Sequence, residues 1–143
     1  MLRKILIFNS FVLTALPSLA ISTNPIQEAQ LLGIWDCVRA DKALEAAFIF
    51  GKDNKVEVII DYFELTHNKR KPISKREDRF GIWQIMENQL VLTVESDATE
   101  QSIKRITEPQ IFLFDVKQLT KKHMQIRELG NDFDMMCKMV KKG

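Results

Sequence analysis

Runs in which apolar and polar residues alternate cover most of this chain of 143 residues. In Lys55–Leu65, for example, valine, isoleucine and tyrosine occupy every second position from Val56 to Tyr62. A period of two places successive side chains on opposite faces of a β-strand, whereas an amphipathic helix has a period near 3.6. Turn-forming residues such as Gly51–Asn54 separate the runs at the spacing of hairpins. The pattern predicts an all-β antiparallel sandwich or barrel of about eight or nine short strands.

The same alternation gives the bounds of the expected elements. A short helical turn is expected at Pro25–Leu31, because Asn24 can cap a helix and proline is tolerated at the first helical position. Strands are expected at Leu32–Val38, Ala46–Phe50, Lys55–Leu65, Phe80–Met86, Gln89–Val94, Ser102–Thr107, Ile111–Gln118, His123–Leu129 and Phe133–Val140. The polar stretch Thr66–Arg79 is expected to be a solvated hairpin end, and Ser96–Gln101 a loop. Pro109 is expected to end a strand, because proline cannot donate to a central ladder.

Residues 1–20 have the three-part composition of a secretory signal peptide. A positive start at Arg3 and Lys4 precedes the mostly apolar Ile5–Leu16, and small residues lead up to Ala20. The alternative is an uncleaved membrane anchor, but the apolar stretch is shorter than the ~20 residues that a membrane-spanning helix needs. We therefore expect cleavage after Ala20, export to the periplasm or the medium, and a single domain at 21–143 that does not stay inserted in a membrane.

The charge balance of that domain argues against a polyanionic partner. The full chain has 21 Lys and Arg against 19 Asp and Glu, and its first 20 residues contain two cations and no acid. Without that segment the chain has no net charge when its histidines are neutral. A neutral domain has no long-range field to attract a polyanion, so we expect no nucleic-acid binding.

Two cysteines, Cys37 and Cys137, lie near opposite ends of the expected domain. An even number of cysteines in an exported chain favours a disulfide. The bond would close a loop of about 100 residues, worth up to ~4.7 kcal/mol in the chain-entropy model. A shared metal ion or a reactive thiol is the competing interpretation, but neither cysteine has a CxxC partner or a nearby histidine.

Alternation places each cysteine on the apolar face of its strand. Trp35 shares a face with Cys37, and Met135 and Met139 share a face with Cys137. If the first and last strands are neighbours, both thiols point to the same side and the sheet closes into a barrel without exposed edges. The alternative is an open sandwich in which the tryptophans are ordinary core residues.

The only two tryptophans follow the same dipeptide, in "GIW" at 33–35 and again at 81–83. A glycine ahead of an inward tryptophan leaves room for the large ring and lets the strand bend at a crowded barrel end. We therefore expect Gly33 and Gly81 to serve the geometry of the fold rather than its chemistry.

Five segments together resemble the small exported bacterial lipocalin-like domains: "LLGIWDC", "FIFGKDNKV", "FGIWQIMENQLVLT", "FDVKQLTKKHMQI" and "FDMMCKMV". Those domains open with Gly-x-Trp, carry a second Gly-x-Trp hairpin near the middle, and in some members have cysteines in the first and last strands. The resemblance spans Leu31–Lys142 and implies an antiparallel up-and-down barrel of about eight strands with a short N-terminal helical turn. Many such domains have an arginine in the last strand over the opening tryptophan, whereas here Lys138 and Met139 follow Cys137. The resemblance implies a fold far more than a function.

The sequence has no arrangement typical of an enzyme. His67 and His123 have no nucleophile at a recognisable spacing, and no nucleophile elbow, zinc-protease motif or phosphate loop is present. We expect both histidines on the surface. Scattered carboxylates such as Asp61 and Glu64 could meet only through the fold. The sequence therefore predicts a protein that is not an enzyme and needs no cofactor.

Methionines cluster around the second cysteine, at Met135, Met136 and Met139. A soft-metal site would need them to converge, but alternation places Met136 on the face opposite Met135. Adaptable core filling is the favoured interpretation, and no metal is expected.

Two binding functions remain open. The first is a barrel pocket for a small hydrophobic ligand, with candidate lining residues Trp35, Phe48, Phe50, Trp83, Phe112, Phe114 and Phe133. Packed side chains could also fill that interior. The second is an interaction or inhibitor protein of the cell envelope that acts through Ile21–Gln30 or Thr66–Arg79. An anionic partner would contact the basic residues Lys69, Arg70, Lys71, Lys75 and Arg76, for which a solvated surface is the favoured alternative.

Overall fold

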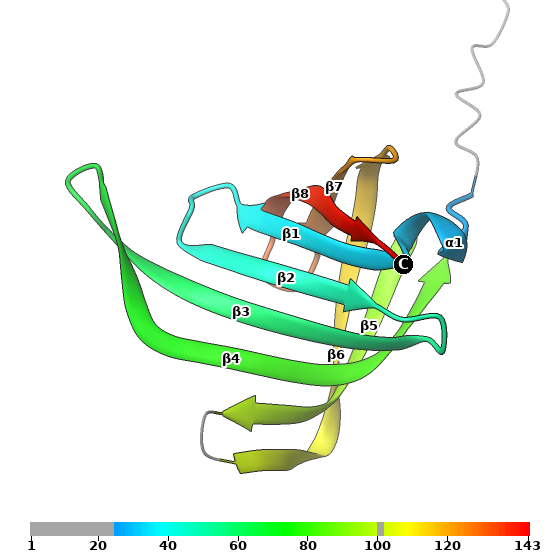
Figure 1. The fold of residues 1–143 in the computed structure, drawn as a ribbon, viewed down its shortest axis with the longest axis horizontal. Coiled ribbons are helices and arrows are strands. Elements are labelled where there is room, and N and C mark those ends of the chain that lie inside the picture. Colours follow the sequence, from blue (N-terminus) through cyan, green and yellow to red (C-terminus); the bar gives the residue numbers. More distant parts are fainter. Residues whose placement is uncertain (1–24, 100–101) are drawn as a thin grey trace, which may run out of the picture.

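The computed structural model describes residues 25–99 and 102–143, so the expected signal peptide at 1–20 lies outside the described residues. Within these ranges the chain forms one short helix and eight antiparallel strands, which close into a barrel in chain order (Figure 1). The elements are α1 (Glu28–Leu31), β1 (Gly33–Arg39), β2 (Leu44–Phe50), β3 (Lys55–Thr66), β4 (Lys69–Met86), β5 (Gln89–Thr99), β6 (Ser102–Leu119), β7 (His123–Glu128) and β8 (Phe133–Lys142). The expected all-β antiparallel barrel is confirmed, and the open sandwich is wrong.

The first and last strands form the seam that closes the barrel. β1 pairs with β8 along its whole length, and Cys37 lies directly opposite Cys137. The two cysteines form a disulfide across this seam. Both lie on the inner face, where they are almost fully buried. The predicted bridge is confirmed, and the metal and free-thiol alternatives for these cysteines are wrong.

Period-two alternation fills the barrel interior. Phe48 and Phe50 on β2, and Val58 and Ile60 on β3, point inward and belong to one core cluster. Met135 joins that cluster from β8, whereas its neighbour Met136 is 55% exposed on the outer face. The expected separation of these two methionines is therefore observed.

The glycines ahead of the tryptophans are required by neighbouring backbone rather than by the indole rings. A Cβ on Gly81 would lie 1.9 Å from the carbonyl oxygen of Thr93, and one on Gly33 would lie 2.2 Å from that of Lys141. Gly33 also has a φ of 126°, a conformation that residues with a side chain rarely adopt. Each glycine lies at or beside a register shift with the neighbouring strand. The expected bend is present, but the space is needed by the adjacent strand.

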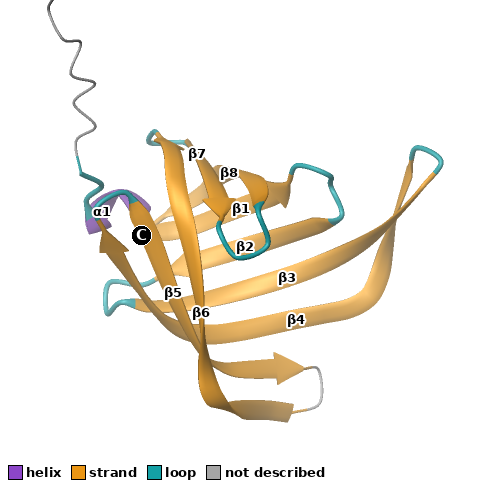
Figure 2. Cartoon of the chain, turned by 180° about the vertical axis from the view of Figure 1, so that it is seen from behind, coloured by secondary structure: helices purple, strands orange, loops and turns teal. Residues whose placement is uncertain are grey.

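The stretch Thr66–Arg79 contains the expected solvated hairpin end, but most of it is strand, because β4 begins at Lys69 and makes a long β-ribbon with β3. β3 and β4 remain paired out to Thr66 and Lys69, and the connecting residues His67 and Asn68 have φ values of 40° and 66°. Two positive φ values in a two-residue connection match the twist of a tight hairpin. The ribbon projects beyond the rest of the barrel (Figures 1 and 2). We call residues 63–76 the β3–β4 arm.

β5 and β6 also extend further than expected. β5 continues to Thr99, so the loop expected at Ser96–Gln101 is wrong for its first part. β6 continues through Pro109 because the register shifts there: Val94 pairs with Gln110, and the next pair joins Ser96 to Arg105. Residues 106–109 thus bulge out opposite a single residue of β5, where a proline removes no ladder hydrogen bond.

Candidate functional site: the barrel cavity

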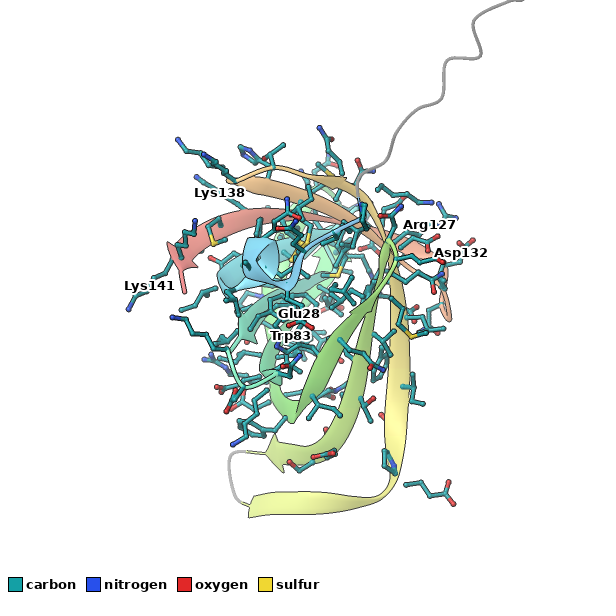
Figure 3. The ribbon with its side chains drawn as sticks, turned by 90° about the vertical axis from the view of Figure 1, so that its right-hand side faces the viewer. Glu28, Trp83, Arg127, Asp132, Lys138 and Lys141 are labelled. Atoms are coloured by element: carbon teal, nitrogen blue, oxygen red, sulfur yellow. A yellow bond between two sulfur atoms is a disulfide. The ribbon has the colours of Figure 1, made fainter. Side chains whose placement is uncertain are left out.

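One end of the barrel is closed by the two tryptophans. The Trp35 indole N–H donates to the carbonyl oxygen of Leu31 in α1 at 2.9 Å, and the Trp83 indole N–H donates to that of Gly51 at 3.2 Å. Both rings are almost fully buried. Figure 3 places Trp83 close to Glu28, the first residue of α1, at this end of the molecule. A buried indole needs a partner for its N–H, and these carbonyls fix each ring in place.

A chain of phenylalanines leads from this closed end toward the middle of the barrel. The ring of Phe50 meets Trp83 edge to face at 5.3 Å between centroids, and Phe48 stacks on Phe50 at 5.9 Å. Phe114 meets Phe48 edge to face at 6.0 Å. Such pairs add about 0.5–1.5 kcal/mol each beyond the area they bury. We call these three phenylalanines the aromatic floor.

Above the floor lies a cavity of about 520 Å³ that opens at the other end of the barrel. Most of its wall is apolar, with Leu44, Val58, Ile60, Leu92, Phe112 and Met135 among the lining side chains. Pockets that hold small molecules commonly have volumes of about 300–1,000 Å³ and predominantly apolar walls. The interior is therefore not filled by side chains, and its size and chemistry suit one small hydrophobic molecule.

Polar groups gather at the open end, first around Arg79. Its guanidinium donates to Glu77 at 2.9 Å, and its Nε lies 3.9 Å from a carboxylate oxygen of Asp97. Tyr62 donates its hydroxyl proton to the same oxygen of Glu77 at 3.1 Å. Arg79 also lies over the ring of Phe112, 5.4 Å from its centroid. The charge is thus paired and covers an aromatic wall of the cavity.

Arg39 makes a similar arrangement on another part of the rim. Its guanidinium donates to both carboxylate oxygens of Asp41, at 2.8 and 2.7 Å, and lies 5.5 Å from the ring centroid of Phe133. This pairing, followed by the hydrogen bond from the Ala43 amide, lowers the pKa of Asp41 below its ordinary value. The side-chain hydrogen bond between Arg39 and Asp41 also raises the pKa of Arg39. The cation at this position is therefore permanent near neutral pH.

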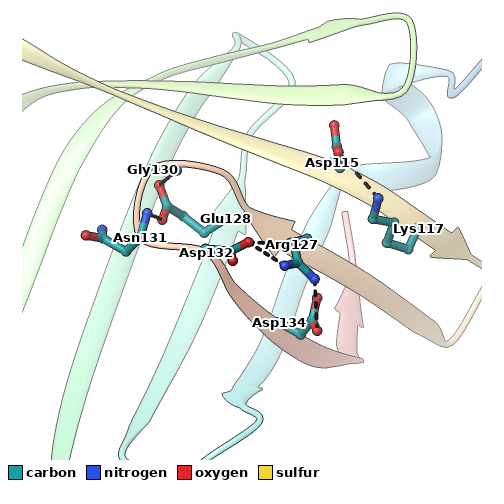
Figure 4. Close-up of polar contacts among 8 residues, drawn as sticks. All are labelled: Asp115, Lys117, Arg127, Glu128, Gly130, Asn131, Asp132 and Asp134. Carbon is teal, nitrogen blue, oxygen red and sulfur yellow. Dashed lines mark hydrogen bonds and ion pairs between the residues drawn. The ribbon is translucent and has the colours of Figure 1, made fainter.

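A buried carboxylate holds the β7–β8 turn against the cavity (Figure 4). Glu128 is 3% exposed and accepts hydrogen bonds from the backbone amides of Gly130, at 3.0 Å, and Asn131. On the outer side of the same turn, Arg127 pairs with Asp132 and lies 3.6 Å from Asp134. Glu128 and Asn131 both line the cavity, so the carboxylate shapes the rim as well as the turn.

The sequence-predicted pocket residues divide into two groups. Phe48, Phe112, Phe114 and Phe133 line the cavity. The other three, Trp35, Phe50 and Trp83, belong to the packed core beneath it and are not among the lining residues.

The polar rim was missed by sequence reasoning, although the same alternation points to it. Counting inward positions back from Trp83 in steps of two gives Gly81, Arg79 and Glu77. Counting forward from Cys37 gives Arg39.

The basic candidates lie on the β3–β4 arm and its base. Arg70 turns back toward the barrel: it pairs with Glu45 at 2.7 Å, donates to the carbonyl oxygen of Lys42 at 2.9 Å, and covers the ring of Phe63. Lys69 and Lys71 are exposed on the ribbon.

The remaining two basic candidates lie nearer the base of the arm. Arg76 lies within 4.0 Å of both Asp61 and Asp78. Lys75 is in β4, and its side chain lies outside the described part.

In the described ranges, no group of three or more His, Cys, Asp or Glu side chains could hold a metal ion. No helix in that part of the chain is long and apolar enough to span a membrane. Neither a model of a known protein family nor a curated protein matches this chain. The closed eight-stranded antiparallel barrel and its Cys37–Cys137 disulfide nevertheless fit a lipocalin-like fold.

Proposed function

We propose that this chain is an exported, non-catalytic binding protein that holds one small hydrophobic molecule in the barrel cavity. The observation that carries the proposal is the cavity itself, because about 520 Å³ of mostly apolar space remains above the aromatic floor. A small apolar molecule that fits such a pocket gains dispersion and hydrophobic energy on binding. The disulfide supports export, since such bonds persist in oxidising compartments.

The distribution of polar groups indicates how the bound molecule would be oriented. The lower wall offers few hydrogen-bonding partners, while the guanidinium groups of Arg39 and Arg79 lie near the rim. A ligand with an apolar body and one polar end would bury the body and leave the polar end at the opening. The carboxylates that pair with these donors keep the empty rim neutralised.

Titration with a neutral apolar dye whose emission rises in a dry environment, such as N-phenyl-1-naphthylamine, tests the proposal. We expect one dye per chain. Val58→Phe, which places a larger side chain on the cavity wall, should weaken dye binding at least about ten-fold, because it removes both volume and apolar contacts.

Ile111→Phe is the matched control. Ile111 is 65% exposed on the outer face of β6, so the same kind of enlargement there leaves the cavity unchanged. Near-UV circular dichroism of both variants checks that the fold is retained. Dye affinity that is equal in wild type and Val58→Phe, or weak dye uptake at several sites, would show that the cavity is not the binding site.

A further inference from the structure

The tip of the β3–β4 arm forms a second, separate hollow of opposite character. Its lining residues are Lys42, Leu65, Thr66, His67, Asn68, Lys69 and Arg70, which include three cations and no acid. The hollow lies between the end of the ribbon and the loop that joins β1 to β2. A concave site whose only charged side chains at neutral pH are cations favours an anion.

Arg70 holds the two sides of this hollow together. Its Nε donates to the carbonyl oxygen of Lys42, so the β1–β2 loop is fixed against the ribbon. Its Nη1 contacts Glu45 at 2.7 Å, and that pairing neutralises much of the arginine's own charge. Two other cations of the hollow, Lys42 and Lys69, have no acidic partner among its described side chains. Both are exposed.

An apolar side chain in the hollow identifies the kind of anion. Leu65 lines the hollow together with the lysines and is 47% exposed. An exposed branched apolar side chain beside lysines suits the boundary between lipid headgroups and acyl chains, where both kinds of group are satisfied. A free phosphate ion would use the lysines but would gain nothing from the leucine.

The position of the arm relates this surface to the cavity. Tyr62 lines the cavity at its open end, and the arm begins at the next residue of β3. The tip therefore projects from the rim, away from the end of the barrel that α1 and the tryptophans close (Figures 1 and 2). Docking through the tip would bring the opening of the barrel close to the surface that is bound.

We propose that the tip of the β3–β4 arm binds the surface of a membrane that contains anionic phospholipids, with Lys42 and Lys69 at the phosphate groups and Leu65 in the headgroup region. The binding is peripheral and reversible. It goes beyond ligand binding in the barrel and does not depend on it.

Flotation with phosphatidylcholine vesicles, with and without about one-third phosphatidylglycerol, tests this proposal. Wild type should bind the anionic vesicles and not the neutral ones, and added salt should weaken the binding. Lys42→Gln/Lys69→Gln should bind about 30-fold less tightly, since each lysine near an anionic surface contributes about a factor of five. Leu65→Ser should also weaken binding, with no change in its salt dependence.

Lys141→Gln/Lys142→Gln is the matched control. It removes the same charge from exposed lysines at the end of β8 next to Gly33, far from the arm (Figure 3 labels Lys141). This control should bind as wild type does, and both double variants should retain dye binding in the barrel. Failure of wild type to bind anionic vesicles, or equal losses in the two double variants, would overturn the proposal. Displacement from vesicles by millimolar inorganic phosphate, or capture by polyglutamate in place of vesicles, would instead assign the hollow to a free anion or an acidic protein and overturn it as well.

Discussion

The disulfide across the seam allows the most quantitative prediction. Cys37 and Cys137 are separated by 100 residues, so their bond closes nearly the whole described domain into one loop. In the chain-entropy model a loop of this length removes enough freedom from the unfolded chain to stabilise the fold by about 4.7 kcal/mol. Small domains commonly have a total stability of about 5–15 kcal/mol. The bond should therefore supply a large share of the stability of this protein.

Urea denaturation of the oxidised and the reduced wild type measures this share directly, because both forms keep the same buried sulfur atoms. With a denaturant dependence near 2 kcal/mol per molar, we expect reduction to lower the unfolding midpoint by about 2 M. Cys37→Ala/Cys137→Ala should lose slightly more stability than the reduced wild type does, because the double substitution also leaves a small void in the core.

Met136→Ala is the control for the loss of a sulfur atom in β8. Met136 lies next to Cys137 in sequence but is exposed on the outer face, so its replacement should change stability by less than about 0.5 kcal/mol. A difference below about 1 kcal/mol between the unfolding free energies of oxidised and reduced wild type would refute the loop argument. It would mean that the unfolded chain is already restricted near the seam.

Two further predictions concern single side chains. Gly81→Ala should destabilise the fold by about 2–3 kcal/mol in urea, because the new Cβ would collide with the Thr93 carbonyl. Gly51→Ala, whose Cβ would lie 2.9 Å from the flexible Asp53 side chain and 3.4 Å from the carbonyl oxygen of Lys55, should cost less than about 1 kcal/mol; equal costs would contradict this reasoning. Asp41 has a lowered pKa in the folded protein because of its hydrogen bond from Arg39, so it stabilises the fold above its unfolded pKa near 4, and this contribution is lost as the pH falls through the folded value. Since Asp41 is half exposed, Asp41→Asn should be less stable than wild type by under ~1 kcal/mol at pH 7, and this difference should shrink as the pH falls below about 4. A difference that stays constant in acid would exclude the ion pair as its cause.

Much of the fold follows from alternation, because each strand of the barrel has one buried face. β2, β7 and β8 could be predicted to within two residues, and the shared inward side of Cys37 and Cys137 predicted the seam. The β4 side of the β3–β4 arm could not be predicted in this way, whereas the expected strand Lys55–Leu65 matches β3 to within one residue. Beyond Tyr62 the ribbon leaves the barrel and has no buried side, so its sequence carries charges on both faces and resembles a loop.

The site was harder to predict than the fold, because alternation says which side chains point inward but not how far along the barrel the packing ends. Trp35 and Phe48 share the inner face, and only the structure shows that Trp35 lies beneath the floor while Phe48 lines the cavity. The rim depends on pairs brought together by neighbouring strands, such as Arg79 and Asp97, which are distant in sequence. Their position at the rim depends on which strands pair in the closed barrel, and the sequence alone does not show this.

The burial of both indoles at the closed end has a practical consequence for spectroscopy. Trp35 and Trp83 are the only tryptophans; neither is among the residues that line the cavity, and each is fixed by its own hydrogen bond. Their emission should shift strongly when the chain unfolds and hardly at all when a colourless molecule enters the barrel. Intrinsic tryptophan fluorescence therefore reports on the folding of this protein. To report on ligand binding, a fluorophore would have to be introduced near Phe133 or be part of the ligand.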